Sequence, residues 1–426
     1  MRVAIVGGGI TGLACALTLE KAGIHEIVLS EAADRLGGKV QTVCEQGFTV
    51  EIGADAIFTR KPVILGLIQD LGLEDEIIQP STSQFSILQH GRLCPVSSGL
   101  LRFGAIDQEA LAQADFLSAQ AKMRVLEEER VPAGTGEDES IASFFCRRYG
   151  EEYSQKIAEP LLAGTHGGAP EQLSMMALYP NYVQLEQKFG SLAAGMRRLG
   201  APAERPTFIS FRRGLGTLVE ALKGSLKKTR VVHEDVSALD SSFSHTVLAI
   251  PAPHASTLLA STSPEASRLL ASIPMASSAI VTFGFEAALD LQGSGFLVPY
   301  SEEAKITGAT WSSNKWVERA PEGQTLLRVF IKRDIETLTD EELIETARNA
   351  LSLPAPSYIR VQRWQKALPL YEVGHLEKVQ AIEAALPPGV HLAGQSYRGV
   401  GIPDCVAQGL RAAGTIVMGD VFASFH

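Results

Sequence analysis

Residues 2–23, RVAIVGGGITGLACALTLEKAG, decide the fold of the first part of the chain. Val3–Val6 is an apolar run typical of a buried strand, and a helical apolar pattern follows over Ile10–Ala22, closed by Gly23. The glycine spacing between them allows a tight strand-to-helix turn, close approach of the backbone to a pyrophosphate, and close helix–strand packing. This spacing predicts a dinucleotide site at the motif Gly7, Gly8, Gly9, Ile10, Thr11 and Gly12.

An acidic residue follows the glycines at the distance that such a site needs. Residues 25–31, HEIVLSE, are typical of a second strand and end in Glu31, about 20 residues after the motif. A carboxylate there holds the ribose hydroxyls and disfavours a cofactor with a 2′-phosphate. For the glycines taken alone, a purely structural tight turn is the alternative interpretation, because glycine-rich loops are common.

Two further segments extend the predicted site. In residues 32–42, AADRLGGKVQT, Gly37 and Gly38 permit close backbone approach, and Arg35 can face phosphate groups. In the segment GFTVEIGAD, a strand leads into the turn Gly53–Asp55, where we expect the reactive end of the cofactor to lie.

Composition limits the class of protein. A chain of 426 residues is long enough for two or three domains, and a net charge of −10 disfavours nucleic acid as a partner. No uncharged apolar run approaches the roughly 18 residues that span a bilayer, and a strand starting at Val3 leaves no room for a signal peptide. The five cysteines have neither paired nor metal-ligand spacing. We therefore expect a cytoplasmic enzyme with no metal and no disulfide framework.

The sequence as a whole predicts one discontinuous domain that is interrupted by two insertions. Helical patterns dominate from Asp107 to Ala163, and strand-like runs follow, among them TFISFRR, AIVTFGFE, TLLRVFI and YIRVQRW. The predicted fold is α/β, with a Rossmann-like, doubly wound dinucleotide-binding domain, a mixed-sheet substrate domain and a helical subdomain. The expected ranges are 1–75, 205–258 and 375–426 for the first, 76–100, 190–204 and 259–374 for the second, and 101–189 for the third.

The motifs carry a resemblance to known proteins. The first 55 residues resemble the flavin amine oxidase superfamily, whose members bind FAD through this glycine motif, the acidic residue and the Arg-x-Gly-Gly extension. The segments EPLLAGTHGGAPEQLSMMALYP, RWQKALPLYEVGH and LAGQSYRGVGIPDCVAQGLRAAG, in this order, resemble the porphyrinogen oxidases of haem synthesis, which act on protoporphyrinogen or coproporphyrinogen III.

The resemblance implies a set of FAD contacts. Besides the glycine motif, Arg35, Gly37 and Gly38, they are Glu31, Ala32, Lys39, Gly53, Ala54, Asp55, Ala56, Val236, Trp364, Gln395, Val400, Gly401 and Ile402. The residues themselves support the last part of this set, because RGVGIP opens a helix whose N-terminal amides suit the electron-rich end of a reduced flavin.

The resemblance also implies the reaction. A carbon bridge of the porphyrinogen gives a hydride to the flavin while a pyrrole N–H loses its proton, and O2 is the expected acceptor, giving H2O2. Lys61, with Arg60 and Arg92 behind it, is the expected partner of a substrate propionate, although solvated surface charge is an equal alternative. No catalytic base is assigned. His166 is either a proton carrier or a structural loop residue.

Other functions stay open at this point. Related flavoenzymes oxidise amines or carotenoids, and some proteins of this fold are chaperones of lipid-modified GTPases that have lost the flavin. Residues 97–106, SSGLLRFGAI, suggest at most peripheral membrane association. The sequence leaves open the choice between the two porphyrinogens, the terminal acceptor and the oligomeric state.

Overall fold

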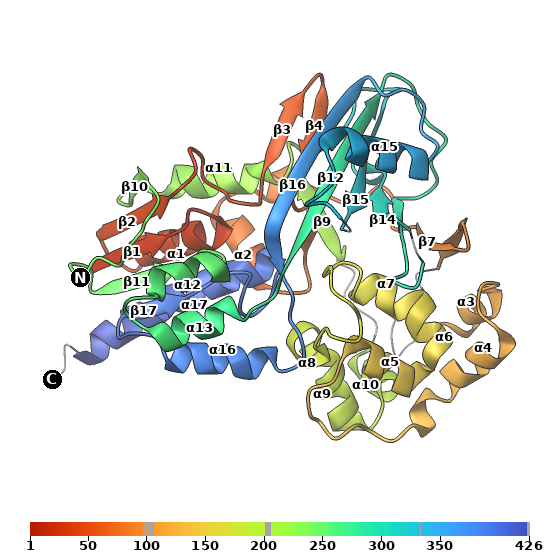
Figure 1. Ribbon diagram of the computed structural model, residues 1–426, viewed down its shortest axis with the longest axis horizontal. Coiled ribbons are helices and arrows are strands. Elements are labelled where there is room, and N and C mark those ends of the chain that lie inside the picture. Colours follow the sequence, from red (N-terminus) through yellow and green to blue (C-terminus); the bar gives the residue numbers. More distant parts are fainter. Residues whose placement is uncertain (98, 101–105, 201–205, 303, 333, 424–426) are drawn as a thin grey trace.

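The computed structural model describes residues 1–97, 99, 100, 106–200, 206–302, 304–332 and 334–423, apart from the side chains of the last four of these (Figure 1). The chain folds into an α/β layer built on a parallel sheet, a large second sheet and a block of helices. Most of the segment 97–106 lies outside the described residues. Among the described residues, no helix combines the length and the apolar character needed to span a membrane.

The first sheet is fully parallel, with the strand order β10-β2-β1-β11-β17. Its strands come from three distant parts of the sequence, so the domain is discontinuous: β1 (Arg2–Val6), β2 (Glu26–Glu31), β10 (Arg230–His233), β11 (His245–Leu248) and β17 (Val390–Leu392). Their apolar residues are buried on both faces, as a parallel sheet between helices requires.

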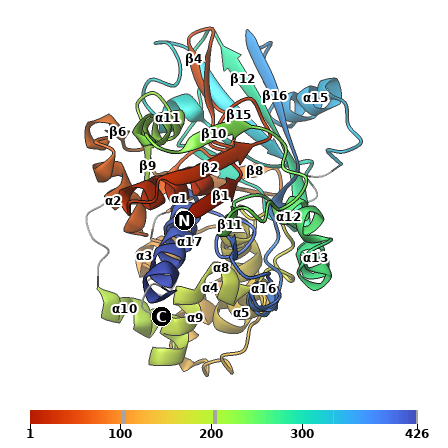
Figure 2. The same ribbon diagram turned by 90° about the vertical axis from the view of Figure 1, so that its left-hand side faces the viewer.

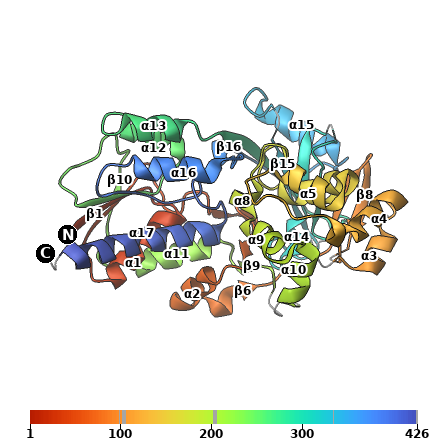
Figure 3. The same cartoon turned by 90° about the horizontal axis from the view of Figure 1, so that it is seen from below.

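Helices cover both faces of this sheet (Figure 3). One layer consists of α1 (Ile10–Lys21), α2 (Val63–Asp70), α11 (Gly216–Ser225) and α17 (Ile402–Ala423), and the other of α12 (Ala252–Leu259), α13 (Pro264–Ala271) and α16 (His375–Ala384). This arrangement confirms the predicted doubly wound α/β fold.

The second sheet is mixed and has the strand order β16-β12-β15-β14-β13-β7-β8. Only β13 and β7 pair in parallel. The helix α15 (Asp340–Ala350) packs on one face, over a core that includes Phe283, Leu327 and Val329. The strands are β7 (Phe85–Gln89), β8 (Arg92–Val96), β12 (Met275–Phe285), β13 (Gly295–Leu297), β14 (Ile306–Thr310), β15 (Thr325–Ile331) and β16 (Tyr358–Pro369).

The helical block lies beside one end of the second sheet (Figure 1). A buried ion network holds it together, because Arg148 donates to Glu128 at 2.6 Å and to Glu186 at 2.9 Å. The main helices are α3 (Gln108–Gln113), α4 (Ala119–Leu126), α5 (Ile141–Tyr149), α6 (Glu151–Tyr153), α7 (Glu159–Leu162), α8 (Met175–Leu178), α9 (Pro180–Phe189) and α10 (Leu192–Leu199).

Short elements join these layers. The hairpin β3–β4 leads to the turn at Gly53, and β9 forms a small sheet between β5 and β6 (Figure 2). Their bounds are β3 (Thr42–Glu45), β4 (Phe48–Glu51), β5 (Ile57–Phe58), β6 (Ile77–Ile78), β9 (Phe208–Phe211) and α14 (Ser312–Lys315).

The packing differs from the predicted domain ranges in two places. Leu192 on α10 is buried in the core of the helical block, although the range 190–204 was expected in the substrate domain. Ala266 and Leu270 on α13 pack with α16 against the parallel sheet, although 259–374 was expected to lie wholly in the second domain. Both differences arise because an amphipathic helix packs on whichever apolar surface its chain reaches, which local sequence does not specify.

The contact between α1 and α17 predicts a contrast between two glycines of α17. A Cβ at Gly409 would overlap the carbonyl oxygen of Thr11, whereas a Cβ at Gly414 meets no atom within 4 Å. Gly409→Ala is therefore expected to lower stability by about 1–3 kcal/mol, and Gly414→Ala to raise it by up to about 1 kcal/mol through helix propensity. Thermal unfolding of both variants measures this, and an unchanged midpoint for Gly409→Ala would contradict the packing.

Candidate functional site

The glycine turn between β1 and α1 forms one end of the candidate site. Gly7 has a φ of 106°, which favours glycine, and Gly9 caps α1 without any side-chain hydrogen bond. A Cβ at Gly9 would meet nothing within 4 Å, whereas one at Gly12 would overlap the carbonyl oxygen of Gly7. The helix N-terminus therefore faces open space at Gly9, and the N–H group of Thr11 has no hydrogen-bond partner among the described residues, as an anion site requires. Ile10 and Thr11 are buried in the first turn.

The predicted acidic residue lies directly beside this turn. Glu31 accepts a hydrogen bond from Gly8 N at 2.7 Å and one from Ala33 N at 2.9 Å. Ala32 is exposed next to it, and Val236 follows the neighbouring strand β10, which pairs with β2 at Glu31. The structure thus brings together the residues that were expected to hold the adenosine half of a dinucleotide.

Gly37 and Gly38 lie against the glycine turn between β1 and α1. Gly37 N donates to Gly8 O at 2.8 Å, and the two glycine segments form a bridge between Gly9 and Gly37. Gly38 follows in a left-handed conformation, and Arg35 donates to its carbonyl oxygen at 3.1 Å. In the structure, Arg35 thus stabilises its own loop through a hydrogen bond to the backbone.

Lys39 follows these glycines as a half-buried cation. Burial lowers its pKa to about 8. Its neighbour Gly53 must be glycine, because a Cβ there would overlap the carbonyl oxygen of Lys39. A partly desolvated ammonium group suits a negatively charged ligand.

The turn Gly53–Ala56 is fixed to the second sheet by one carboxylate. Asp55 accepts from Lys315 at 2.5 Å, from Trp316 Nε1 at 3.3 Å and from Arg328 at 3.4 Å. Arg328 also donates to Gly53 O at 2.6 Å. The neighbouring cations hold the pKa of Asp55 at about 2 in spite of its burial.

A second buried carboxylate lies behind this turn. Glu51 accepts from Leu215 N at 2.7 Å and Thr42 Oγ1 at 2.8 Å, with Arg319 at 3.7 Å. Burial raises the pKa of Glu51 to about 7. Sequence analysis missed Glu51, Arg319, Lys315 and Arg328. The available signal for the last of these was a lone arginine inside the apolar strand TLLRVFI.

Residues from β16 and the C-terminal tail complete the other end of the site, the flavin end, where the flavin is expected to lie. Trp364 Nε1 donates to Ile52 O at 3.2 Å, which places the indole beside the Gly53 turn. Gln395 Nε2 donates to Ala367 O at 2.6 Å, so the tail is bound to β16. Ala54 and Ala56 lie in the Gly53 turn. Val400 and Gly401 lead into α17, and Ile402 is the first residue of that helix.

The three predicted substrate contacts are separated in the structure. Lys61 is about half exposed and forms an ion pair with Asp404 in the first turn of α17, next to the tail residues above. Arg60 is exposed and lies 3.5 Å from Thr207 Oγ1. Arg92 opens β8, at the opposite edge of the second sheet from Trp364, and pairs with Asp115 at 3.5 Å. Lys61 alone is thus placed at the flavin end.

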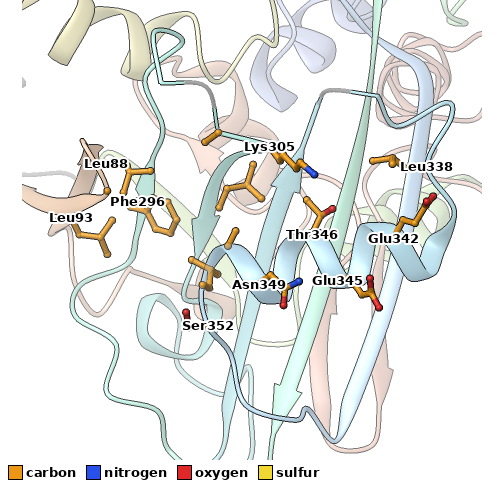
Figure 4. Close-up of a pocket in the computed structure, with 15 residues that line it drawn as sticks. Leu88, Leu93, Phe296, Lys305, Leu338, Glu342, Glu345, Thr346, Asn349 and Ser352 are labelled. Atoms are coloured by element: carbon orange, nitrogen blue, oxygen red, sulfur yellow. The ribbon is translucent and has the colours of Figure 1, made fainter.

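A pocket of about 760 Å³ lies elsewhere, between α15 and the β7–β8 hairpin (Figure 4). Leu93 and Phe296 form part of its apolar side, and Lys305, Glu342 and Glu345 add charge. It contains none of the predicted site residues, so we do not assign the reaction to it.

Asp55 predicts a pH-dependent stability. Its pKa of about 2 lies below the ordinary 3.8, so the stabilisation is present above pH 4 and is lost as the pH falls from about 4 towards 2. Asp55→Asn should lower the thermal midpoint at pH 7, because it leaves Lys315 and Arg328 without a buried anion, and this loss should shrink at pH 3.

The matched control is Asp70→Asn, which removes an exposed partner of Lys21. It should change the midpoint little at either pH. A loss for Asp55→Asn that does not depend on pH would contradict the role of its charge.

Comparison with known proteins agrees with this geometry. The family model for flavin-containing amine oxidoreductases matches residues 10–417. The coproporphyrinogen III oxidase of Bacillus subtilis (strain 168) is 33% identical over 96% of this chain and 97% of its own length. The mitochondrial protoporphyrinogen oxidase of Nicotiana tabacum is 28% identical over 98% and 94%.

Solved structures extend the likeness to the fold. A protein of Exiguobacterium sp. 255-15 is 32% identical, with a TM-score of 0.87 over 98% of this chain and 99% of that one. A reduced UDP-galactopyranose mutase, 16% identical with a TM-score of 0.74 over 98% and 95%, shares the fold. The chain therefore belongs to the family of flavin-containing amine oxidoreductases, in the group that contains the porphyrinogen oxidases.

Proposed function

We propose that the protein is an FAD-dependent porphyrinogen oxidase of haem synthesis, acting on coproporphyrinogen III or protoporphyrinogen IX. The observation that carries the proposal is the uncapped N-terminus of α1, with open space at Gly9 and the carboxylate of Glu31 beside it. The names of the full-length relatives support a porphyrinogen as substrate.

The residues present fit FAD along the whole site. The first turn of α1 would hold the pyrophosphate, and Glu31 the ribose next to the adenine, with Val236 at the adenine. Lys39, the turn Gly53–Ala56, Trp364 and the tail Gln395–Ile402 would hold the flavin end. When bound, the flavin supplies the two-electron chemistry, and the chain binds and orients the substrate against it.

The negative charge of both the chain and the substrate indicates which residues bind the substrate. The chain carries a net charge of −10, whereas a porphyrinogen carries several carboxylates, so cations at the flavin end must offset an unfavourable field. Lys61 is the predicted propionate partner, and the carboxylate of Asp404 holds its position in the structure. We propose O2 as the acceptor, with H2O2 as the second product.

The test compares substrates and products directly. Protein grown with ample riboflavin should be yellow and release FAD on denaturation. With coproporphyrinogen III or protoporphyrinogen IX under air, it should form porphyrin fluorescence faster than autoxidation, together with peroxide. A colourless protein would favour a non-catalytic binder of this fold, and turnover of amines or carotenoids alone would contradict the substrate.

Gly9 provides a prediction that separates flavin binding from folding. Gly9→Ala fills the space that faces the N-terminus of α1 without touching another atom. It should leave the thermal midpoint of the flavin-free protein unchanged and lower flavin affinity about tenfold or more, because a methyl group excludes the pyrophosphate from the amides. Isothermal titration with FAD measures this, and an affinity equal to wild type would place the dinucleotide elsewhere.

Lys61 provides a prediction for substrate binding. Lys61→Ala should raise the Michaelis constant about fivefold or more with either porphyrinogen, because it removes a charged contact and leaves Asp404 to repel the carboxylate. Flavin content and the flavin spectrum should not change. Lys21→Ala, which breaks an exposed lysine–aspartate pair, is the control. Equal Michaelis constants for wild type and Lys61→Ala would place Lys61 among solvated surface charges.

A further inference from the structure

Lys332 lies at the same height along the strands of the second sheet as Trp364 of the flavin end. Ala279 on β12 is opposite Ile331 on β15, and Ser278 is opposite Trp364 on β16. Lys332, one residue beyond Ile331, therefore lies about two strand spacings, or about 10 Å, from Trp364.

The side chain of Lys332 lies on the same face of β15 as Arg328, because residues of a strand alternate between its two faces. Arg328 reaches the Gly53 turn on that face, whereas Leu327, Val329 and Ile331 fill the core beneath α15 on the other. Lys332 thus points away from the core of its own sheet, towards the helical block.

The contacts of Lys332 are with backbone and apolar groups. Its Nζ donates to Gly164 O at 2.5 Å, and its aliphatic carbons lie beside Gly167, which also approaches Leu368. No carboxylate lies within 4.0 Å of this Nζ in the part of the chain that the structure describes. A lysine offers three donors, so two are available to a ligand.

The surroundings of Lys332 make an unpaired charge costly. Its side chain is half-buried, and burial lowers its pKa to about 8. A buried ammonium group without an anion is destabilised until a negative partner binds. Every other buried or half-buried cation of the flavin end described above, except Lys39, has a carboxylate: Arg328 and Lys315 share Asp55, and Arg319 lies near Glu51.

His166 lies close enough to Lys332 and Lys61 for the charges of both to act on it. Burial, together with the charges of Lys332 and Lys61, lowers the pKa of His166 to about 4, so its imidazole is neutral at pH 7. Tyr179 donates its hydroxyl hydrogen to Leu162 O at 3.0 Å, so its oxygen accepts from His166 Nε2 at 3.1 Å. This hydrogen bond fixes the neutral imidazole as the Nε2–H form.

The loop that carries His166 is fixed to the flavin end. Ser174 N donates to Tyr371 O at 2.7 Å, and Tyr371 donates its hydroxyl to Gln395 O at 2.6 Å. The loop therefore keeps a defined position relative to the tail that leads into α17, and Lys332 is bonded to Gly164 of this loop and Lys61 to Asp404 of α17.

We propose that Lys332 binds one carboxylate of the porphyrinogen, as a second anchor beside Lys61. This inference rests on the proposed function and extends it to substrate choice. Both porphyrinogens carry enough propionates to meet two cations, but coproporphyrinogen III has more of them and can do so in more orientations, so we expect it to bind more tightly than protoporphyrinogen IX.

Equilibrium binding of coproporphyrin III, the stable oxidised product, tests this without turnover. Its fluorescence is titrated with the flavin-loaded wild type, Lys332→Met and Lys332→Arg, and its tetramethyl ester serves as the uncharged probe. Lys332→Met should weaken binding of the acid about fivefold or more and binding of the ester little, while Lys332→Arg restores binding. Lys305→Met, in the pocket beneath α15, is the matched control and should not differ from wild type.

A pH series adds a readout that a merely structural lysine would not move. In the wild type, affinity for coproporphyrin III should fall as the pH rises through about 8, because Lys332 loses its proton. The charge of Lys332 acts on one other titratable group of the described residues, His166, which is hydrogen-bonded to Tyr179. Burial also raises the pKa of Tyr179, and His166 is neutral throughout this range. Lys39 also titrates near pH 8, so the comparison with Lys332→Arg, which stays charged, isolates Lys332.

Each outcome decides one question. If wild type binds neither porphyrin nor FAD, the proposed function fails. If wild type binds coproporphyrin III and Lys332→Met, with unchanged flavin content and thermal midpoint, binds it equally well, Lys332 is not an anchor. If Lys332→Met loses acid and ester equally, or Lys332→Arg shows the pH dependence of wild type, the role of the charge is contradicted.

Discussion

The arrangement of the site depends on the ion pairs and hydrogen bonds of the Asp55 carboxylate. Asp55 lies in the turn after β4, and its partners are Arg328 on β15 of the second sheet, Lys315 at the end of α14, and Trp316 directly after that helix. A largely buried carboxylate between two cations tolerates little displacement, because a shift would leave these groups without their partners. The Asp55 contacts therefore hold the turn Gly53–Ala56 beside Trp364. They also determine where the side chains of β15 lie relative to this turn.

The distribution of charge explains how an acidic protein can receive an acidic substrate. The net charge is −10, and most acidic side chains lie on the surface, where salt screens them. The cations Lys39, Arg328 and Lys332 lie instead in partly or fully desolvated positions around the flavin end, where a charge acts more strongly. Arg328 is already paired within the protein, whereas the other two are available to ligands. This division suits a site that binds an anionic cofactor and an anionic substrate together.

Local sequence was enough to predict the arrangement of the glycine turn and Glu31. The glycine spacing and the strand that ends in Glu31 are separated by few residues, so their geometry follows from the turn itself. The contacts that build the substrate end were not predictable in this way. Lys61 meets Asp404 across 343 positions, and Asp55 meets Arg328 across 273. Arg92 was expected near Lys61, but the pairing of β8 at the far edge of the second sheet places it about six strand spacings from β16. Strand order in a mixed sheet is set by tertiary packing, which no single motif encodes.

The central claim is that a porphyrinogen reduces the flavin held in this site. Anaerobic mixing of the FAD-loaded protein with coproporphyrinogen III in a stopped-flow instrument tests it directly. We expect the visible absorbance of the oxidised flavin to disappear at least as fast as steady-state turnover and to return when oxygen is admitted. Flavin that stays oxidised with coproporphyrinogen III and protoporphyrinogen IX, or that is reduced only by an amine, would contradict the account.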